Sequence, residues 1–298
     1  MQVTNRLQPP VLQILTWNVE YLTMKDPEKL HGSTDCSVDW ACLRRWAGYI
    51  EQWLANRYQL GFRFVFLQEF VSTPESHERL RDICSKWHMT PYIMSVGRFH
   101  VCILVDATMV EHAPERPYQK TGYIGETYSP YYAIGWKILK FLLVNVHAPH
   151  GRQNTIRQSH HQLVEKLEAD LGSLKDWRIV MAGDWNHSVT QGDEYYFQQI
   201  NTQKHAKWLV HTTKVPNAPT CCYHGDRENW LQSTPTLAYD HIITNLVDAI
   251  HGYPVLVRNP NHARGKYHSD HLPVTVTLRT PRALRDHYGT HGKNGCNR

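Results

Sequence analysis

The segment Ile179-Val-Met-Ala-Gly-Asp-Trp-Asn-His187 joins a short apolar run to a group of carboxylate, amide and imidazole side chains. An apolar run of this length predicts a buried β-strand, here over Arg178–Met181. The polar residues that follow then lie where a rigid strand meets a loop, a common position for binding and catalytic groups. The segment therefore predicts a functional site at the end of a core strand.

Five further segments repeat this arrangement of an apolar strand with a polar end. They are Ile14-Leu-Thr-Trp-Asn18, Phe64-Val-Phe-Leu-Gln-Glu69, Leu142-Leu-Val-Asn-Val-His-Ala-Pro-His150, Leu237-Ala-Tyr-Asp-His241 and Tyr267-His-Ser-Asp-His271. Taken singly, each polar residue has an ordinary reading as a solvated strand end or a turn former. Six such segments in one chain favour a single shared site over six unrelated turns.

The composition is that of a globular protein. In 298 residues, 32 Lys and Arg face 27 Asp and Glu, and 41% hydrophobic with 20% charged residues argues against a disordered or fibrous chain. The longest strongly apolar run, Phe141–Val146, is far shorter than the ~20 residues of a membrane helix, so we expect no membrane span. The net charge of +5 permits a polyanionic partner without requiring one.

Many short strands with few helices between them predict packed sheets covered by helices, rather than an alternating parallel fold. The expected strands are Val11–Trp17, Phe62–Leu67, Tyr92–Val96, Val101–Val105, Tyr132–Ile138, Phe141–Val146, Arg178–Met181, Trp208–His211, Tyr239–Thr244, Tyr253–Val257 and Leu272–Leu278. The expected helices are Trp40–Tyr58, Ser76–Trp87 and Thr155–Leu171. No linker interrupts the pattern, so we expect one domain over 1–278. The basic segment 279–298 lacks apolar periodicity and is expected to be a flexible C-terminal tail.

The cysteines indicate whether the protein belongs in a reducing or an oxidising compartment. Seven scattered cysteines, an odd number, suit reduced thiols. No secretory-type apolar segment precedes the first expected strand, so we expect an intracellular protein of the cytoplasm or nucleus. A zinc site of Cys221, Cys222 and His224 is an alternative use of three of these residues, disfavoured because the C-x-x-C pairs of zinc sites are missing.

Leu-Thr-Trp-Asn-Val, Leu-Gln-Glu, Gly-Asp-Trp-Asn and Ser-Asp-His-Leu-Pro-Val, in this order, resemble the motifs of the endonuclease/exonuclease/phosphatase superfamily. This superfamily includes deoxyribonuclease I, abasic-site endonucleases, retrotransposon endonucleases, tyrosyl-DNA phosphodiesterases, deadenylases, neutral sphingomyelinases and inositol-phosphate 5-phosphatases. Leu-Gln-Glu alone is a weak motif and Gly-Asp-x-Asn a moderate one, but the ordered set is a strong signal and extends from Trp17 to about Leu278. The resemblance implies an α+β fold: a four-layered α/β sandwich of two mainly antiparallel sheets flanked by helices.

The resemblance also implies a metal site. Asn18 and Glu69 match the amide and carboxylate of the family's metal site, and Asp270 matches a carboxylate that supports the metal. A few hard oxygen ligands suit Mg²⁺, with Mn²⁺ as the alternative.

The catalytic residues that the resemblance implies are His147, Asp184, Asn186, Asp240 and His271. Asp184 and Asn186 match the pair near the scissile phosphate, whose Asp orients or deprotonates the attacking water. His271 acts on the phosphate or the water, and Asp240 matches the acidic residue that hydrogen-bonds a catalytic histidine. His147 matches the other catalytic histidine of the deoxyribonuclease-like branch. Which histidine is the acid and which the base stays open.

The remaining expectations concern the substrate. His150, Arg152 and Lys266 are expected to bind it, and Trp185 and Tyr267 offer stacking surfaces for bases. Surface cations and core aromatics are the ordinary alternative for such residues. The unusually long interval between Asn18 and Glu69 contains an inserted segment, 23–39, either a substrate lid or a loop without function. Phe70-Val71 stand where abasic-site enzymes commonly have Lys, which disfavours that specialisation.

Together these features predict a Mg²⁺-dependent nuclease that hydrolyses phosphodiester bonds by metal-assisted attack of water, with DNA favoured as partner and endonucleolytic cleavage expected. The alternative is a phosphodiesterase or phosphatase acting on protein–DNA adducts, inositol phosphates or a sphingolipid. A binding module that has lost its chemistry is disfavoured, since both histidines and every expected carboxylate are present.

Overall fold

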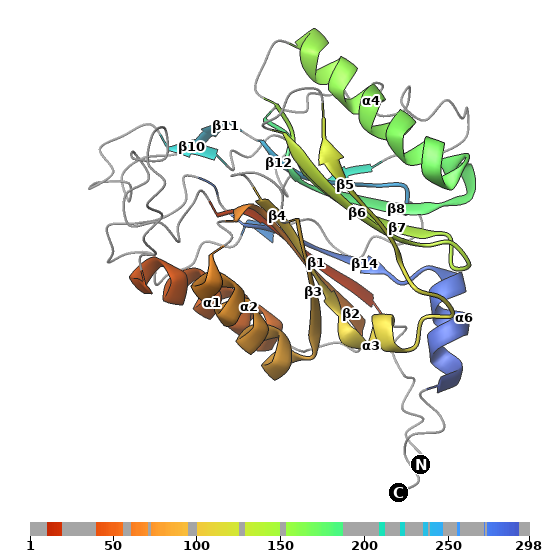
Figure 1. The fold of residues 1–298 in the computed structure, drawn as a ribbon, viewed down its shortest axis with the longest axis horizontal. Coiled ribbons are helices and arrows are strands. Elements are labelled where there is room, and N and C mark those ends of the chain that lie inside the picture. Colours follow the sequence, from red (N-terminus) through yellow and green to blue (C-terminus); the bar gives the residue numbers. More distant parts are fainter. Residues whose placement is uncertain are drawn as a thin grey trace, which may run out of the picture.

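The structure is a computed structural model (Figure 1). It describes residues 11–19, 40–55, 61–70, 73–94, 100–124, 129–149, 153–186, 209–211, 221–223, 235–237, 239–246, 255–256, 271 and 273–291. Within this part of the chain, no helix is long and apolar enough to cross a membrane.

The strands in the described residues form two six-stranded sheets and one two-stranded ribbon. The first sheet has the order β13 (Val255–Leu256), β14 (Val274–Arg279), β1 (Val11–Asn18), β2 (Gly61–Phe70), β4 (His100–Asp106) and β3 (Met89–Ile93). The second has the order β5 (Tyr118–Tyr123), β6 (Pro130–Trp136), β7 (Phe141–His147), β8 (Arg178–Asp184), β12 (Asp240–Thr244) and β9 (Leu209–His211). The ribbon pairs β10 (Cys221–Tyr223) with β11 (Pro235–Leu237).

Each six-stranded sheet contains one parallel pair, and the other pairings described are antiparallel. The parallel pairs are β1 with β2 and β7 with β8. Parallel neighbours need a crossover connection, and a helix lies in each of these two connections. These helices are α1 (Trp40–Ala55) and α4 (Gln153–Leu171). The two sheets therefore carry the same β–α–β unit at their centres.

The main core lies between the sheets and follows from the two-residue period of the strands. Ile14, Phe64 and Phe66 of the first sheet join Leu143 and Val180 of the second in one buried cluster. Ala182 of β8 and Ile242 of β12 belong to the same cluster. Burying these apolar faces against each other holds the sheets together.

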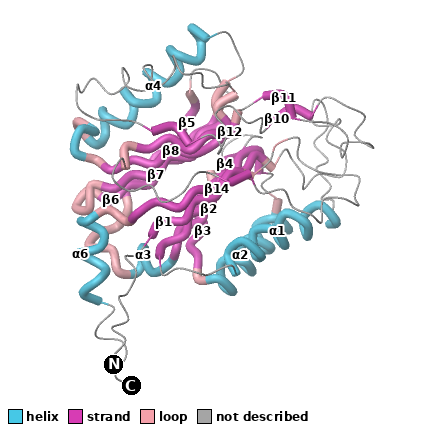
Figure 2. The backbone as a smooth tube through the Cα atoms, turned by 180° about the vertical axis from the view of Figure 1, so that it is seen from behind, coloured by secondary structure: helices cyan, strands magenta, loops and turns pink. Residues whose placement is uncertain are grey.

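The outer faces of the sheets are covered by helices (Figure 2). Val65 and Leu67, which alternate with the inner residues of β2, pack with Ile50 of α1 and Leu80 of α2 (Pro74–Trp87). On the other side, outward residues of β7 and β8 pack with Leu163 and Leu167 of α4. The result is a four-layered α/β sandwich, which confirms the expected fold class.

The segment after β14 differs from expectation. Residues predicted to form a flexible tail form α6 (Arg282–His291). Leu284 is buried in the main core, and the Tyr288 hydroxyl donates a hydrogen bond to the carbonyl of Met109 at 2.7 Å. The prediction was wrong for 282–291 because two apolar side chains, one turn apart, are enough to dock a helix.

Several smaller elements were also not predicted from the sequence. They are β5, the ribbon strands β10 and β11, and α3 (Ala107–Glu111). Strand β5 lies at the edge of its sheet and its residues are half-buried or exposed, so it lacks the apolar run that marks the central strands. The expected central strands are all present, with ends shifted by a few residues.

Gly183 permits the close approach of β8 to β7. The two strands are in register at Val146 and Gly183, and a Cβ atom added to Gly183 would lie 1.9 Å from the carbonyl oxygen of Val146. Any side chain at Gly183 must therefore push the two strands apart. This pair directly precedes the pair of His147 and Asp184.

Replacing Gly183 with alanine is expected to lower the free energy of unfolding by roughly 1–3 kcal/mol or more, the usual cost of overpacking. Gly48→Ala is the matched control, because Gly48 lies in α1 with nothing within 4 Å of the added Cβ. That change should be neutral or stabilise the protein by roughly 0.5–1 kcal/mol. Urea unfolding of both variants measures the difference, and equal stability would contradict the close contact.

Candidate active site

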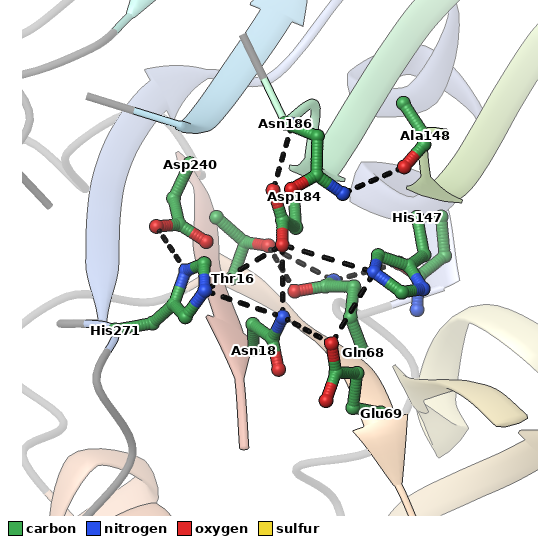
Figure 3. Close-up of polar contacts among 11 residues, drawn as sticks. Thr16, Asn18, Gln68, Glu69, His147, Ala148, Asp184, Asn186, Asp240 and His271 are labelled. Atoms are coloured by element: carbon green, nitrogen blue, oxygen red, sulfur yellow. Dashed lines mark hydrogen bonds and ion pairs between the residues drawn. The ribbon is translucent and has the colours of Figure 1, made fainter. Parts of the chain in front are cut away.

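The polar ends of the four parallel strands meet at one place. Asn18 ends β1, Glu69 stands next to the last residue of β2, His147 ends β7 and Asp184 ends β8. Because both parallel pairs have their carboxyl ends on the same side of the sandwich, the four side chains converge (Figure 3). A crevice at the carboxyl ends of parallel strands is a common place for ligand sites.

A β-bulge turns Glu69 toward the site. Simple alternation along β2 would place Glu69 on the outer face with Val65 and Leu67. The register between β2 and β4 shifts between Leu67 and Phe70, and Glu69 has a φ of 51°. Phe70 accordingly packs in the outer cluster, as an extra residue in the strand requires. The carboxylate of Glu69 instead contacts Asn18 and His147 on the inner side.

Asp184 is the centre of the site. Its Oδ2 accepts a hydrogen bond from Nδ2 of Asn18 at 2.8 Å and lies 3.6 Å from Nε2 of His271 and 3.8 Å from Nε2 of His147. Its Oδ1 accepts from the backbone N–H of Asn186 at 2.8 Å. The side chain is 2% exposed. Asp184 is thus a buried carboxylate whose two oxygens each accept a hydrogen bond and whose Oδ2 lies between two imidazole rings.

His271 and Asp240 form a buried pair. Nδ1 of His271 lies 2.8 Å from Oδ2 of Asp240, which is fully buried at the start of β12. Since a carboxylate accepts and does not donate, Nδ1 carries the proton in this contact. Nε2 then faces Asp184 and Asn18. The indole N–H of Trp17 donates to the backbone carbonyl of His271 at 3.1 Å and fixes that backbone.

His147 lies on the opposite side of Asp184 from His271 (Figure 3). Its Nε2 is 3.3 Å from Oε1 of Glu69. Oε1 of Glu69 also accepts a hydrogen bond from Nδ2 of Asn18 at 3.1 Å. The Glu69 side chain is 15% exposed, against 8% for His147, so Glu69 is the more accessible of the two.

Asn186 organises the loop after β8. Its side-chain amide donates to the carbonyl of Ala148 at 2.7 Å, and the N–H of Ala148 donates to the carbonyl of Asp184 at 2.8 Å. Asn186 has a φ of 51°, a left-handed conformation that asparagine tolerates better than most residues. In the structure Asn186 therefore holds the loops after β7 and β8 together.

The donor groups fit a divalent cation. Within the described part of the chain, two groups could hold one: Glu69, His147 and Asp184, and Asp184, Asp240 and His271. The donor atoms of each group lie within 4.8 Å of one another. The partly buried Glu69 carboxylate and the buried Asp184 carboxylate share one amide donor, and a cation would compensate their negative charge. The carboxylate oxygens of Glu69 and Asp184 suit a hard cation such as Mg²⁺, whereas Asn18 presents its Nδ2 to both carboxylates.

The sequence did not identify a layer of buried polar residues under the site. Thr16, Gln68 and Asn145 are all fully buried on the inner faces of their strands. Their position in the sequence could have indicated them, since alternation places each of these polar residues inward among apolar ones.

Trp185 does not serve as the stacking surface that was expected of it. It is 1% exposed and its indole N–H donates to the carbonyl of His241 at 3.3 Å, so no ring face is open to a base.

Several expected residues lie outside the described residues. They are the metal-site candidate Asp270, the substrate-binding candidates His150, Arg152 and Lys266, the stacking candidate Tyr267, His224 of the zinc alternative, and the inserted segment 23–39. Their expected roles stay predictions.

Two described cysteines are unsuited to act as nucleophiles. Cys84 and Cys102 are free and buried. Burial raises the pKa of the Cys84 thiol to about 12 and that of the Cys102 thiol well above its usual range. Both remain protonated at neutral pH, and the thiolate is the reactive form.

Comparison with known proteins identifies the fold. No protein-family model and no curated protein sequence matches the chain. An endonuclease/exonuclease/phosphatase from Bacteroides vulgatus has a TM-score of 0.58 at 14% identity, covering 91% of this chain and 99% of that one. D. rerio TDP2 complexed with a single-strand DNA product has a TM-score of 0.55 at 16% identity, covering 91% and 99%.

The inositol polyphosphate 5-phosphatase domain of SPsynaptojanin, in complex with inositol (1,4)-bisphosphate and calcium ion, has a TM-score of 0.53 at 12% identity, covering 96% of this chain and 92% of that one. The chain thus has the deoxyribonuclease I-like fold of the endonuclease/exonuclease/phosphatase superfamily, which confirms the fold that the sequence motifs implied.

The Asp240–His271 contact predicts the tautomer of His271. In the parent protein the neutral ring should carry its proton on Nδ1, facing the Asp240 carboxylate. In Asp240→Asn the new amide can donate to Nδ1 and favour the Nε2–H form instead. ¹⁵N NMR of the imidazole rings measures this, with His271→Gln identifying the signal.

Asp106→Asn is the control for this tautomer measurement. Asp106 is also buried, but it pairs with Arg63 at 3.0 Å, near the opposite end of β2 from Glu69. That variant should leave the His271 signal unchanged. The same tautomer in the parent and in Asp240→Asn would show that Asp240 does not orient the ring.

Proposed function

We propose that the protein is a Mg²⁺-dependent nuclease that hydrolyses phosphodiester bonds, with DNA as the favoured substrate and endonucleolytic cleavage as the expected mode. The observation that carries this proposal is the placement of the buried Asp184 carboxylate between two histidines, beside the amide and carboxylate of Asn18 and Glu69. Phosphodiester hydrolysis needs these groups: a base for water, a proton donor for the leaving oxygen, and positive charge at the phosphate.

Asp184 is the group that orients and deprotonates the attacking water. Its Oδ1 is held by the backbone N–H of Asn186, which leaves Oδ2 as the oxygen directed into the site. The carboxylate is almost completely buried, so it acts where bulk water competes least for its lone pairs. Asn18 fixes the position of Oδ2 at 2.8 Å.

The two histidines contact the phosphate and supply the proton. Asp240 holds Nδ1 of His271, so His271 presents Nε2 to the substrate, and a carboxylate partner stabilises a positive ring. His147 presents Nε2 from the other side of Asp184. Because the two imidazoles lie on opposite sides of Asp184, one of them can contact the phosphate while the other protonates the leaving oxygen. Glu69 and Asn18 would hold the cation, which would supply positive charge to offset the charge that develops on the phosphate oxygens.

Two observations favour a nucleic-acid substrate. The chain carries a net charge of +5, and a structural neighbour, D. rerio TDP2, is complexed with a single-strand DNA product. His150 ends one motif-bearing segment, Arg152 follows it and Lys266 precedes another, and all three are proposed to contact the substrate. We place the protein in the cytoplasm or nucleus, because free thiols such as Cys84 and Cys102 suit a reducing compartment.

The second candidate is a phosphatase or phosphodiesterase that acts on inositol phosphates, protein–DNA adducts or a sphingolipid. A neighbour of the same fold is in complex with inositol (1,4)-bisphosphate. The same constellation of carboxylates and histidines would serve that reaction, so the substrate alone separates the two candidates.

Activity is expected to require a divalent cation held through Glu69. Purified protein with Mg²⁺ should cleave at least one member of a panel of supercoiled DNA, single-stranded DNA, RNA, 5′-tyrosyl DNA, inositol phosphates and sphingomyelin. Chelation should abolish cleavage, and Glu69→Gln should need more Mg²⁺ because a ligand charge is lost. Asp184→Asn should stay folded and lose roughly 10²–10⁴-fold in rate, the range for a positioned base.

Glu51→Gln is the control for the cation assay, since Glu51 pairs with Arg79 and Lys86 on the outer helices. It should leave the Mg²⁺ dependence unchanged. Full activity in excess chelator would refute the cation assignment. Cleavage of inositol phosphates or sphingomyelin, with none of any polynucleotide, would refute the nuclease and retain the cation site.

Binding of nucleic acid is expected to weaken steeply with monovalent salt. Each phosphate contact adds roughly 0.7–0.9 to the slope of log affinity against log salt, depending on strandedness. Arg152→Ala and Lys266→Ala should weaken binding of all sequences alike and reduce the slope by up to about one unit each. Titration across oligonucleotides of increasing length measures both quantities on the same samples.

Arg282→Ala is the matched control for the salt titration. Its side chain is 86% exposed, and α6 follows the end of β14 that pairs with the start of β1, opposite Asn18. It should leave the slope unchanged. Affinity that depends on neither salt nor length would rule out an extended contact with a nucleic-acid backbone.

A further inference from the structure

Asn145 joins the two sheets directly under the candidate active site. It lies on the inner face of β7, two residues before His147, and is fully buried. Its Nδ2 donates two hydrogen bonds across the interface, to the carbonyl of Leu67 in β2 at 2.9 Å and to that of Cys102 in β4 at 2.8 Å. Both hydrogens of the amide are therefore used to hold the opposite sheet.

The two carbonyls that Asn145 binds mark the start of the bulge. Leu67 and Cys102 form the last register pair of β2 and β4 before the shift, and pairing resumes at Phe70 and His100. Regular ladder hydrogen bonds are disrupted at a bulge, so this point needs support from elsewhere. Asn145 hydrogen-bonds to both strands at the point where their own regular pairing stops.

Gln68 fixes the orientation of the Asn145 amide. Nε2 of Gln68 donates to Oδ1 of Asn145 at 2.7 Å and to Oγ1 of Thr16 at 3.1 Å. With Oδ1 accepting from Gln68 and Nδ2 donating twice, reversing the amide would set a donor against a donor. A fully satisfied buried network of this kind specifies one geometry.

We propose that Asn145 is a positioning residue that holds the β2 bulge and thereby directs the Glu69 carboxylate into the cation site. Glu69 is inserted in the segment between Leu67 and Phe70, with a φ of 51°, and it would face the outer helices if β2 continued in regular alternation. Asn145 touches neither cation nor substrate and acts through the β2 backbone alone.

This inference rests on the proposed function, because it takes Glu69 to be a cation ligand. Groups that orient metal ligands typically change metal affinity when they are removed. Loss of Asn145 should therefore weaken cation binding even in the absence of substrate. A residue that only stabilised the fold would lower the melting temperature without this effect.

The test measures Mn²⁺ binding to the full chain by the electron paramagnetic resonance signal of free Mn²⁺, without substrate. Asn145→Ala should raise the Mn²⁺ dissociation constant roughly 10- to 100-fold, the usual effect of removing an orienting partner. Asn145→Ser, whose hydroxyl donates one hydrogen bond in place of two, should give an intermediate value. The serine variant also carries the test if the alanine variant does not fold.

Asn245→Ala is the matched control. Asn245 also ties its amide to backbone, donating to the carbonyl of Trp177 at 2.7 Å and accepting from the N–H of Ile179 at 2.8 Å. Those contacts lie at the opposite end of β8 from Asp184. Asn245→Ala should lower the melting temperature and leave Mn²⁺ affinity at the parent value.

Glu69→Gln separates the two possible failures. If Glu69→Gln binds Mn²⁺ as tightly as the parent, the cation site itself is wrong. If Glu69→Gln loses affinity while the folded Asn145 variants keep it, the cation site stands and the positioning role is overturned. Equal losses in Asn145→Ala and Asn245→Ala would also overturn it, since general destabilisation would then explain the effect.

Discussion

The rest of the structure depends on the contact between the inner faces of the two sheets, which changes character along its length. Over most of the interface, branched and aromatic side chains such as Phe64, Leu143 and Val180 exclude water. At the carboxyl ends of the parallel strands, polar side chains replace them. Because a buried polar group without a partner costs free energy, these side chains must satisfy one another across the interface.

This requirement couples the precision of the site to the stability of the sandwich. Asn18 of the first sheet donates to Asp184 of the second, and Asn145 of the second sheet donates to carbonyls of the first. The sheets cannot slide past each other by one residue without breaking all of these bonds. Apolar contacts alone would tolerate such a shift more easily, since they are less directional.

The sequence predicted the parts of the site that obey simple strand periodicity. The strands that Asn18 and Asp184 end were predicted from their apolar runs, and both residues were expected at the polar ends of those strands; alternation in the observed strands turns both inward. Glu69 was expected in the site from its motif, yet periodicity would have turned it outward. The bulge that corrects this is set by a partner on a different sheet, and no local pattern in β2 reveals that partner.

Long-range partners explain the other differences as well. Asn145 was visible in the sequence as one polar residue in an apolar strand, but its two acceptors are carbonyls of β2 and β4 that only the tertiary structure brings near. Trp185 was a candidate stacking surface, with a core position as the alternative, and its burial depends on packing with residues of other strands and of α4. The helix of residues 282–291 is stabilised by the burial of Leu284 in the main core, a contact with residues distant in the sequence.

The pairing of β14 with β1 limits how early the fold can be completed during synthesis on the ribosome. The first described strand pairs with the last one, and His271 lies shortly before that last strand. Contacts between such distant segments form late, because they require the whole intervening chain. A growing polypeptide carries Asn18, Glu69 and Asp184 before it carries His271, so the His271–Asp240 pair cannot form until residue 271 has been made. Chains that stop before residue 271 are therefore expected to lack this side of the candidate site.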